Sequence, residues 1–415
     1  MLAGLSADNM DEFERSSEES LDELEALLET AGGVCCARLL QNRATPDPRS
    51  FLGEGKVAEL KAMAKAEGCT LAVFDNELSP SQQRVLSEDL EMKVLDRNGL
   101  ILDIFAQRAQ TREGRLQVEL AQYKYLLPRL TGMWTHLVRQ TASGGSSPIG
   151  TRGPGETQLE TDRRHIRRKI QKLEDELESV RQVRSTQRRA REKNGVPVVA
   201  LVGYTNAGKS TLLNHLTGAG IHANNRLFDT LDTTTRKLEI DPTTKVLLSD
   251  TVGFIRKLPH HLVEAFKATL EELCYADVLL HVIDASNPEW TIQAQVVEGL
   301  IHELGAGETP RINVFNKCDL YTEDILPGDK ESVRVSAMTG QGVDVLLEKI
   351  VQILDRGKKR VSLMIPYNRG DITEMLHRLA EIKSMEYEQE GTKVEAVVTP
   401  EVYGRVRTFV LRDDE

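Results

Sequence analysis

A glycine-rich loop between an apolar run and a helical pattern is the strongest chemical signal in this sequence. It reads Gly203-Tyr-Thr-Asn-Ala-Gly208-Lys209-Ser210 and follows the strand-like run VVALV. Glycines let such a loop wrap so that successive backbone N–H groups point at a phosphate. The lysine adds a positive charge for the β- and γ-phosphates, and the serine hydroxyl is a ligand for Mg²⁺. The spacing therefore predicts a P-loop that binds a nucleoside triphosphate.

Three further motifs follow in order, each at the end of an apolar strand-like run. They are Asp250-Thr251-Val252-Gly253, Asn316-Lys317-Cys318-Asp319 and Ser336-Ala337-Met338. An aspartate at position 250 can hold a Mg²⁺-bound water, and the N–H of Gly253 can sense the γ-phosphate. Asp319 can accept the N1–H and the N2 amino hydrogens of guanine, a donor pair that adenine lacks. The run that starts at Ser336 can add a backbone contact to the guanine O6, so the motifs together predict a GTPase.

The segment between the loop and Asp250 is rich in threonine and reads LFDTLDTTTRKLEI. A GTPase needs one hydroxyl here to complete the coordination of Mg²⁺ while the γ-phosphate is present. Loss of that contact after hydrolysis releases the segment, which is the switch. Spacing alone leaves four candidates: Thr230, Thr233, Thr234 and Thr235.

Two residues bear on the rate of hydrolysis. Phe254 stands where many small GTPases have the glutamine that positions water, so we expect slow intrinsic hydrolysis that a partner stimulates. Asn206 is compatible with a potassium ion that supplies positive charge at the β–γ bridge, and equally with simple capping of the loop. The candidates for catalysis are Lys209, Asp250, Gly253 and Asn206.

The elements around these motifs predict a multi-domain α/β protein. Residues 196–356 have the pattern of a P-loop GTPase domain with a parallel-rich sheet. Residues 1–96 predict a small parallel α/β domain whose first 30 residues form an acidic tail, with the runs GVCCARLL, TLAVFD and KVLD as strands and helices between them. Residues 357–415 predict a small α+β appendage with two or three short strands and a helix.

Residues 97–195 predict an antiparallel helical hairpin. Apolar residues recur there at steps of three or four, which places each set on one face of a helix. The two stripes are Leu116, Leu120, Tyr123 and Leu127, and Ile166, Ile170, Leu173, Leu177 and Val180. The segment 143–155 contains seven glycines or prolines and predicts the loop at the tip of the hairpin.

Composition excludes several classes of protein. The formal net charge of −11 argues against a general nucleic-acid coat, although residues 152–193 hold thirteen Lys/Arg against eight Asp/Glu. Apolar runs fall short of the roughly 20 residues that a membrane span needs. The acidic N-terminus is unlike a secretory signal, so we expect a cytoplasmic protein. The five scattered cysteines favour free thiols over a disulfide or a metal site.

Over nearly its whole length the sequence resembles the HflX family, within the Obg–HflX group of translational GTPases. The most specific stretch is IGTRGPGETQLETDRRHIRRKI (149–170), which is similar to the family's hallmark before the GTPase domain. The segments FLGEGKVAEL, GYTNAGKSTLLN, DTVGFIRKLP and VIDAS, and residues 95–130, are also similar to family segments. The resemblance implies a protein that associates with the ribosome, chiefly its large subunit, in a GTP-dependent way. Family members are credited with splitting stalled or stress-inactivated ribosomes or with a role in ribosome assembly.

The resemblance also implies roles for particular residues. Within FDTLD it assigns the Mg²⁺-contacting threonine to Thr230, with Ser210 as the other protein ligand. The sequence departs from the family pattern where LDTTTR lacks a proline after the aspartate, and in a hairpin loop that is a few residues longer. The nucleotide-contact candidates are Gly203, Tyr204, Thr205, Asn206, Ala207, Gly208, Lys209, Ser210, Thr211, Phe228, Asp229, Thr230, Leu231, Asp232, Asp250, Thr251, Val252, Gly253, Asn316, Lys317, Cys318, Asp319, Ser336, Ala337 and Met338.

A basic cluster opens the second hairpin helix. It consists of Arg163, Arg164, Arg167, Arg168 and Lys169, with Arg152 on the preceding loop. So many positive charges suit the phosphate backbone of ribosomal RNA, and salt bridges along the hairpin are the alternative. The competing function is a signalling switch that acts on a protein partner without touching RNA. In either function we expect a monomer. A second nucleotide site in residues 33–96 is disfavoured, because GEGKV lacks the P-loop spacing.

Overall fold

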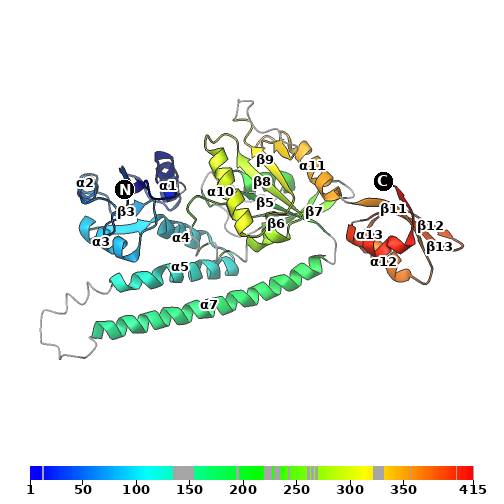
Figure 1. The fold of residues 1–415 in the computed structure, drawn as a ribbon, viewed down its shortest axis with the longest axis horizontal. Coiled ribbons are helices and arrows are strands. Elements are labelled where there is room, and N and C mark those ends of the chain that lie inside the picture. Colours follow the sequence, from blue (N-terminus) through cyan, green and yellow to red (C-terminus); the bar gives the residue numbers. More distant parts are fainter. Residues whose placement is uncertain are drawn as a thin grey trace.

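The structure is a computed structural model that describes residues 1–11, 14–133, 154–192, 196–218, 227–228, 234–241, 244–258, 262, 266, 270–320, 331–356, 358–398 and 400–414. These residues form three separate sheets with their helices, and a long helical hairpin (Figure 1). The three sheets follow one another along the longest axis of the molecule, and the hairpin runs beside the first two. The fold class is the multi-domain α/β class that the sequence predicts.

The N-terminal sheet is parallel and has the order β2-β1-β3-β4. Its strands are β1 (Leu2–Ala7), β2 (Arg38–Arg43), β3 (Leu71–Phe74) and β4 (Lys93–Asp96). Its helices are α1 (Glu18–Thr30), α2 (Glu54–Ala66), α3 (Pro80–Leu90) and α4 (Arg97–Arg108). α3 has a capped start: Pro80 is its first residue, and Ser79 accepts a hydrogen bond from the Gln82 N–H at 3.2 Å.

The prediction of an acidic tail at residues 1–30 is wrong. β1 lies inside the sheet between β2 and β3, and α1 buries Leu21, Leu24 and Leu27 completely. The carboxylates of α1 occupy the remaining faces of this amphipathic helix, so a high acidic content hid a helical pattern. The predicted strand at 33–40 is also shifted, because β2 begins at Arg38.

The hairpin is formed by α5 (Arg112–Met133) and α7 (Pro154–Glu192). Leu120, Leu173 and Leu177 are buried together, and three partly buried side chains of the two predicted stripes pack against them: Leu116, Tyr123 and Ile170. Ile166 of the second stripe is also buried. An early residue of α5 pairs with a late residue of α7, Glu113 with Arg184 at 2.8 Å, and this confirms the antiparallel arrangement.

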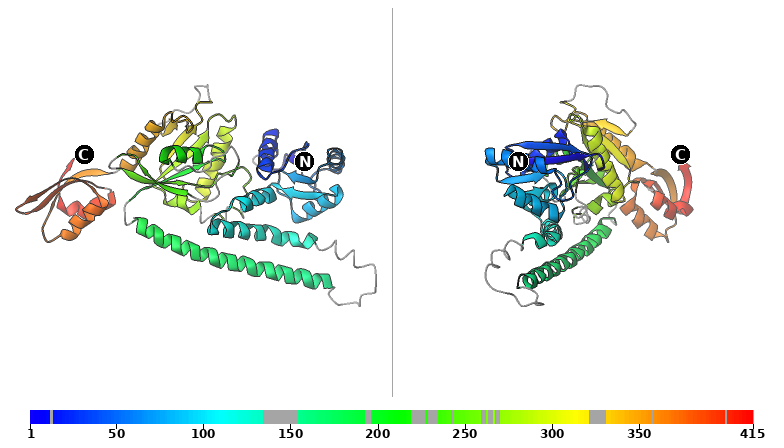
Figure 2. Two further views of the ribbon diagram at one scale, coloured as in Figure 1. Left: turned by 180° about the vertical axis from the view of Figure 1, so that it is seen from behind. Right: turned by 60° about the vertical axis from the view of Figure 1, so that its left-hand side comes forward.

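The predicted loop at the hairpin tip lies mostly in residues 134–153, outside the described residues. Its last two residues were wrongly assigned, because Pro154 and Gly155 begin α7. Proline is tolerated at the first position of a helix, since the N–H that it lacks has no intrahelical partner there. Seen from behind, α7 extends from beside the N-terminal sheet to the GTPase sheet (Figure 2).

The central sheet has the order β10-β9-β8-β5-β7-β6, and among its described strands only β6 is antiparallel. The strands are β5 (Val198–Gly203), β6 (Thr234–Glu239), β7 (Lys245–Asp250), β8 (Val278–Asp284), β9 (Arg311–Asn316) and β10 (Ser332–Arg334). The surrounding helices include α8 (Lys209–Thr217), α10 (Trp290–Glu303) and α11 (Val343–Asp355). The middle strands are almost fully buried, as parallel strands covered on both faces must be.

The C-terminal unit is an antiparallel sheet of four strands with the order β12-β13-β11-β14. The strands are β11 (Lys359–Ile365), β12 (Glu381–Glu388), β13 (Gly391–Val398) and β14 (Val410–Asp414), with α12 (Gly370–Leu379) and α13 (Pro400–Val406) packed on them. The sequence predicts one or two strands too few here, because β12 exposes most of its residues and has a weak apolar pattern.

An aromatic cluster joins the N-terminal sheet to the central one. Phe105 of α4 contacts Phe228 with ring centroids 4.7 Å apart, and Phe266 at 5.2 Å. Phe254 is buried in the same core. Among the described helices, none combines the length and the apolar character that a membrane crossing requires.

Candidate nucleotide site

The glycine-rich loop connects β5 to α8 at the carboxyl edge of the central sheet. Gly208 has a φ of +94°, and a Cβ at this position would lie 2.2 Å from Nδ2 of Asn316. Asn206 also has a positive φ, +60°, which asparagine adopts more readily than most residues. The residue types of the loop thus satisfy backbone conformations that most side chains would strain.

Lys209 begins α8 and is buried, with 4% of its surface exposed. Its ammonium group donates to the carbonyl oxygens of Gly203 at 3.0 Å and Tyr204 at 2.8 Å. Burial lowers the pKa of Lys209 to about 8, although the nearby carboxylate of Asp250 opposes the shift. The ammonium group of Lys209 therefore lies against the glycine-rich loop, where it can contact an anionic ligand.

Ser210 and Asp250 bring two metal-binding oxygens together. The Ser210 hydroxyl donates to Oδ2 of Asp250 at 2.8 Å, while Oδ1 of Asp250 is buried without a hydrogen-bond partner in the described part of the chain. Burial raises the pKa of Asp250, against the influence of Lys209. Hydroxyl and carboxylate oxygens suit Mg²⁺, so Ser210 would bind it directly and Asp250 through water. A Mg²⁺ ion bound there would neutralise charge on the β- and γ-phosphates.

The segment after β7 packs directly on the glycine-rich loop. The N–H of Thr205 donates to the carbonyl of Phe254 at 2.7 Å, and the N–H of Phe254 donates to the carbonyl of Gly203 at 3.1 Å. A Cβ on Gly253 would lie 2.9 Å from Cα of Thr205 and 3.1 Å from Nζ of Lys209. Only glycine brings this backbone so close to the lysine. Phe254 is 1% exposed and belongs to the core, so its side chain cannot position water.

Asn316 ties the guanine motifs to the loop. Its Nδ2 donates to the carbonyl of Ala207 at 2.8 Å, and its Oδ1 accepts the N–H of Ala337 at 2.9 Å. Lys317 has a φ of +60° and pairs with Asp284 at 2.6 Å. Asp319, two residues after Lys317, is exposed to solvent. In the same region Cys318 is partly buried, Ser336 is fully buried and Met338 is 80% exposed.

The predicted switch segment is described only in part. Phe228 is buried, and its N–H donates to Oγ1 of Thr205 at 3.0 Å. Four of the predicted contacts, Asp229, Thr230, Leu231 and Asp232, lie outside the described residues, as does Thr233. Thr234 and Thr235 are on β6, opposite Asp250 and Ser249 of β7. As paired strand residues, these two are held in the sheet.

The predicted RNA contacts lie on α7, apart from the nucleotide site. Arg164, Arg167 and Arg168 are exposed, and Arg163 is partly exposed. Lys169 is also exposed, and its ammonium donates to the hydroxyl of Tyr123 at 2.7 Å across the hairpin. The position of Arg152 is outside the described residues.

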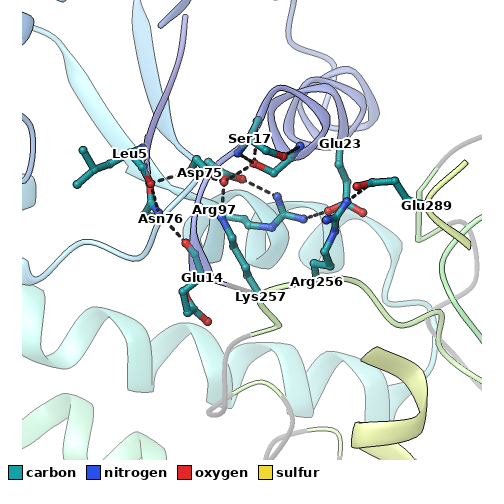
Figure 3. Close-up of polar contacts among 12 residues, drawn as sticks. Leu5, Glu14, Ser17, Glu23, Asp75, Asn76, Arg97, Arg256, Lys257 and Glu289 are labelled. Atoms are coloured by element: carbon teal, nitrogen blue, oxygen red, sulfur yellow. Dashed lines mark hydrogen bonds and ion pairs between the residues drawn. The ribbon is translucent and has the colours of Figure 1, made fainter. Parts of the chain in front are cut away.

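Sequence reasoning missed a set of polar residues that connects the site to the N-terminal domain (Figure 3). Tyr204 of the glycine-rich loop donates a hydrogen bond to Glu23 of α1, and Lys257 forms an ion pair with Asp75, which follows β3. Arg97 is buried between Glu23 and Asp75 and pairs with both. A fully buried arginine is rare. The local sequence around each residue offers no sign of these partners.

The structure thus brings the four motifs to one edge of a largely parallel sheet, linked through Phe254, Gly253 and Asn316. This fold and this site define a P-loop GTPase. Residues 198–317 match a family described as 50S ribosome-binding GTPase, residues 18–106 match the GTP-binding GTPase N-terminal family, and residues 108–191 match the GTP-binding GTPase middle region.

Similar proteins agree along most of the chain. The GTPase HflX of Caldanaerobacter subterraneus subsp. tengcongensis is 48% identical over 395 residues, which cover 95% of this chain and 91% of that protein. The GTPase HflX of Escherichia coli is 45% identical over 381 residues, covering 90% and 88%. The chain belongs to the HflX family, and it binds and hydrolyses GTP. A crystal structure of a Sulfolobus solfataricus GTP-binding protein in complex with GDP is 25% identical, with a TM-score of 0.43 and coverage of 86% and 99%.

Proposed function

We propose that this GTPase acts on the ribosome. In its GTP-bound form it docks chiefly on the large subunit and splits stalled or stress-inactivated ribosomes, or takes part in ribosome assembly. The exposed basic face of α7, formed by Arg164, Arg167 and Arg168, is the observation that carries the proposal. The family that residues 198–317 match is described as 50S ribosome-binding GTPase, and this match supports the proposal.

The shape of the hairpin suits a deep, charged binding surface. α7 has 39 residues, so it is roughly 60 Å long at the rise of an α-helix. Its basic face lies near the end that is remote from the GTPase sheet (Figure 1). Arginine side chains there can contact RNA phosphates while the nucleotide site stays clear of the contact.

The test is sedimentation of the purified protein with intact ribosomes and with separated subunits. We expect co-migration with the large subunit, and loss of intact ribosomes, with a non-hydrolysable GTP analogue but not with GDP. Arg164→Glu combined with Arg167→Glu should abolish binding, and rising salt should weaken it in the parent protein. Lys383→Glu, at an exposed lysine of the C-terminal sheet, is the matched control. Binding in no nucleotide state would instead favour a switch that acts on a protein partner.

We propose further that the protein works as a monomer in the cytoplasm and that Mg²⁺ is held by Ser210 and Thr230. A potassium ion beside Asn206 would add positive charge at the β–γ bridge. Hydrolysis should then be faster in potassium than in sodium buffer, and Asn206→Gly, which keeps the positive φ, should remove the difference. Equal rates in the two salts would leave Asn206 as a residue that only shapes the loop.

A further inference from the structure

Tyr204 occupies the second position of the glycine-rich loop, and its hydroxyl makes two hydrogen bonds. It donates to the carboxylate of Glu23, and it accepts the backbone N–H of Arg256 at 2.8 Å. The side chain is 4% exposed. Burial raises the pKa of Tyr204 well above its usual value, and Glu23 adds to the shift, so the phenol keeps the proton that it donates.

The second bond links the loop to the segment that carries Gly253. Tyr204 already pairs with Phe254 through an isolated backbone bridge. The phenol extends this contact by two residues to Arg256, so the chain beyond Gly253 is held against the loop at two points. The nearby N–H of Gly253 is the predicted γ-phosphate sensor, and a Cβ on Gly253 would lie 3.1 Å from Nζ of Lys209.

Ion pairs also hold the same segment. The Arg256 guanidinium pairs with Glu289, and the Lys257 ammonium pairs with Asp75. Lys257 adopts a φ of +54°, a conformation that a lysine rarely takes without such contacts. In Figure 3, Arg97 joins Glu23 to Asp75, and Lys257 of this segment reaches the same Asp75 carboxylate. The phenol of Tyr204 thus lies between two elements that the surrounding structure keeps in fixed positions.

We propose that Tyr204 is a positioning residue for GTP hydrolysis. Its phenol holds the backbone of Arg256, and through it the N–H of Gly253, in the register that contacts the γ-phosphate, while Glu23 fixes the direction of the phenol. Tyr204 itself touches neither the phosphates nor the attacking water. The alternative is a purely structural role, in which the buried tyrosine only stabilises the fold. The two roles differ in what they do to ligands with and without a γ-phosphate.

The experiment is Tyr204→Phe, which keeps the ring and removes both hydrogen bonds. We expect kcat for GTP to fall about five- to tenfold, the factor expected from one lost hydrogen bond in the transition state. Affinity for a non-hydrolysable GTP analogue should fall by a similar factor, with affinity for GDP unchanged. The matched control is Tyr387→Phe, because Tyr387 is 76% exposed on β12. It should leave all three quantities unchanged.

A second pair of variants changes Glu23, the acceptor of the hydrogen bond from the Tyr204 hydroxyl. Glu23→Gln keeps an acceptor for the Tyr204 hydroxyl and should retain most of the activity. Glu23→Met has a similar length but no acceptor, and it should reproduce the selective loss for ligands with a γ-phosphate. Folding of each variant is checked by its melting temperature, because Glu23 also pairs with Arg97.

Three results would overturn the proposal. Unchanged kcat and unchanged GTP-analogue affinity in folded Tyr204→Phe would reduce the residue to a structural role. Equal losses for GDP and the GTP analogue would mean that it only preserves the loop. A rise in kcat would show that the bond to Arg256 restrains hydrolysis instead of supporting it.

Discussion

Lys209 and Asp250 are opposite charges that share a buried site, and burial pushes each toward its neutral form. The pKa of Lys209 falls to about 8 and the pKa of Asp250 rises. Their mutual attraction opposes both shifts without cancelling them. The phosphates of the nucleotide would stabilise the charged form of Lys209, and the metal ion would stabilise the charged form of Asp250. Nucleotide binding should accordingly be linked to proton uptake.

The first prediction is that GTP affinity falls above pH 8. The phosphates stabilise the ammonium form of Lys209, so binding raises its pKa and takes up a proton. Below pH 8 the lysine is already charged and affinity should be nearly constant. At pH 9 affinity should be about tenfold lower, one factor of ten per pH unit above the pKa of the free site. Titration with a fluorescent GTP analogue from pH 6.5 to 9.5 measures it. Lys209→Met should bind weakly with little dependence on pH, and a parent profile equally flat would contradict the prediction.

The second prediction concerns the base. Asp319→Asn replaces an acceptor with an amide that can donate, so the N1–H and N2 amino hydrogens of guanine lose their partner. GTP affinity should fall on the order of a hundredfold or more, and xanthosine triphosphate, which has an oxygen at position 2, should be preferred. Competition of the two triphosphates for one labelled nucleotide measures the change. Retained preference for GTP would remove Asp319 from base recognition.

The nucleotide motifs are predictable from sequence because each is local: a few adjacent residues at the end of a strand carry a whole function. The partners of Tyr204 and Lys257 are not, since Glu23 and Asp75 lie 181 and 182 residues away along the chain. The sequence around Tyr204 also does not show whether its side chain contacts the nucleotide or the N-terminal domain. The choice among the four threonines likewise stays a prediction from family resemblance at Thr230.

At the level of elements, periodicity predicts the hairpin but not β1 and α1. The stripes of α5 and α7 repeat over many turns, so their pattern survives a high content of charge. α1 has only 13 residues and two acidic residues in its first turn, and carboxylates stand between Leu21 and Leu24 and between Leu24 and Leu27. A short helix of this kind is stabilised by packing on the sheet more than by its own propensity. That packing is invisible before the strand order is known.

The third prediction tests the packing of the hairpin. Leu173→Ala removes a side chain that is buried between α7 and α5 at 7% exposure, and it should lower the free energy of unfolding by about 2–4 kcal/mol. Val183→Ala on the same helix, at a residue 58% exposed, should change it by less than about 0.5 kcal/mol. Urea denaturation followed by circular dichroism compares the two variants. Equal effects would mean that α7 does not pack on α5 in solution.

In the whole molecule, Asp75 joins the N-terminal domain to the GTPase domain. It is completely buried and accepts Arg97 at 2.7 Å, Ser16 at 2.7 Å and the ammonium of Lys257. Burial alone would raise its pKa, but Arg97 and Lys257 hold the pKa of Asp75 below its ordinary value. Lys257 is the only member of this group that comes from the segment after Gly253. The contact between the domains thus depends on the same stretch of chain that approaches the γ-phosphate.

The fourth prediction follows from this dependence. Asp75→Ala leaves Arg97 and Lys257 buried without their shared carboxylate, so it should destabilise the protein by about 3–5 kcal/mol. Lys257→Met should cost less, because Asp75 keeps Arg97 and Ser16. Because the folded pKa of Asp75 is depressed, its contribution is present above the unfolded pKa of about 4 and is lost as the pH falls through the lower folded value. The parent should therefore lose more stability between pH 6 and pH 3 than Asp75→Asn does, as measured by thermal unfolding at each pH. The same pH dependence in both proteins would mean that Asp75 is not the charge that joins the two domains.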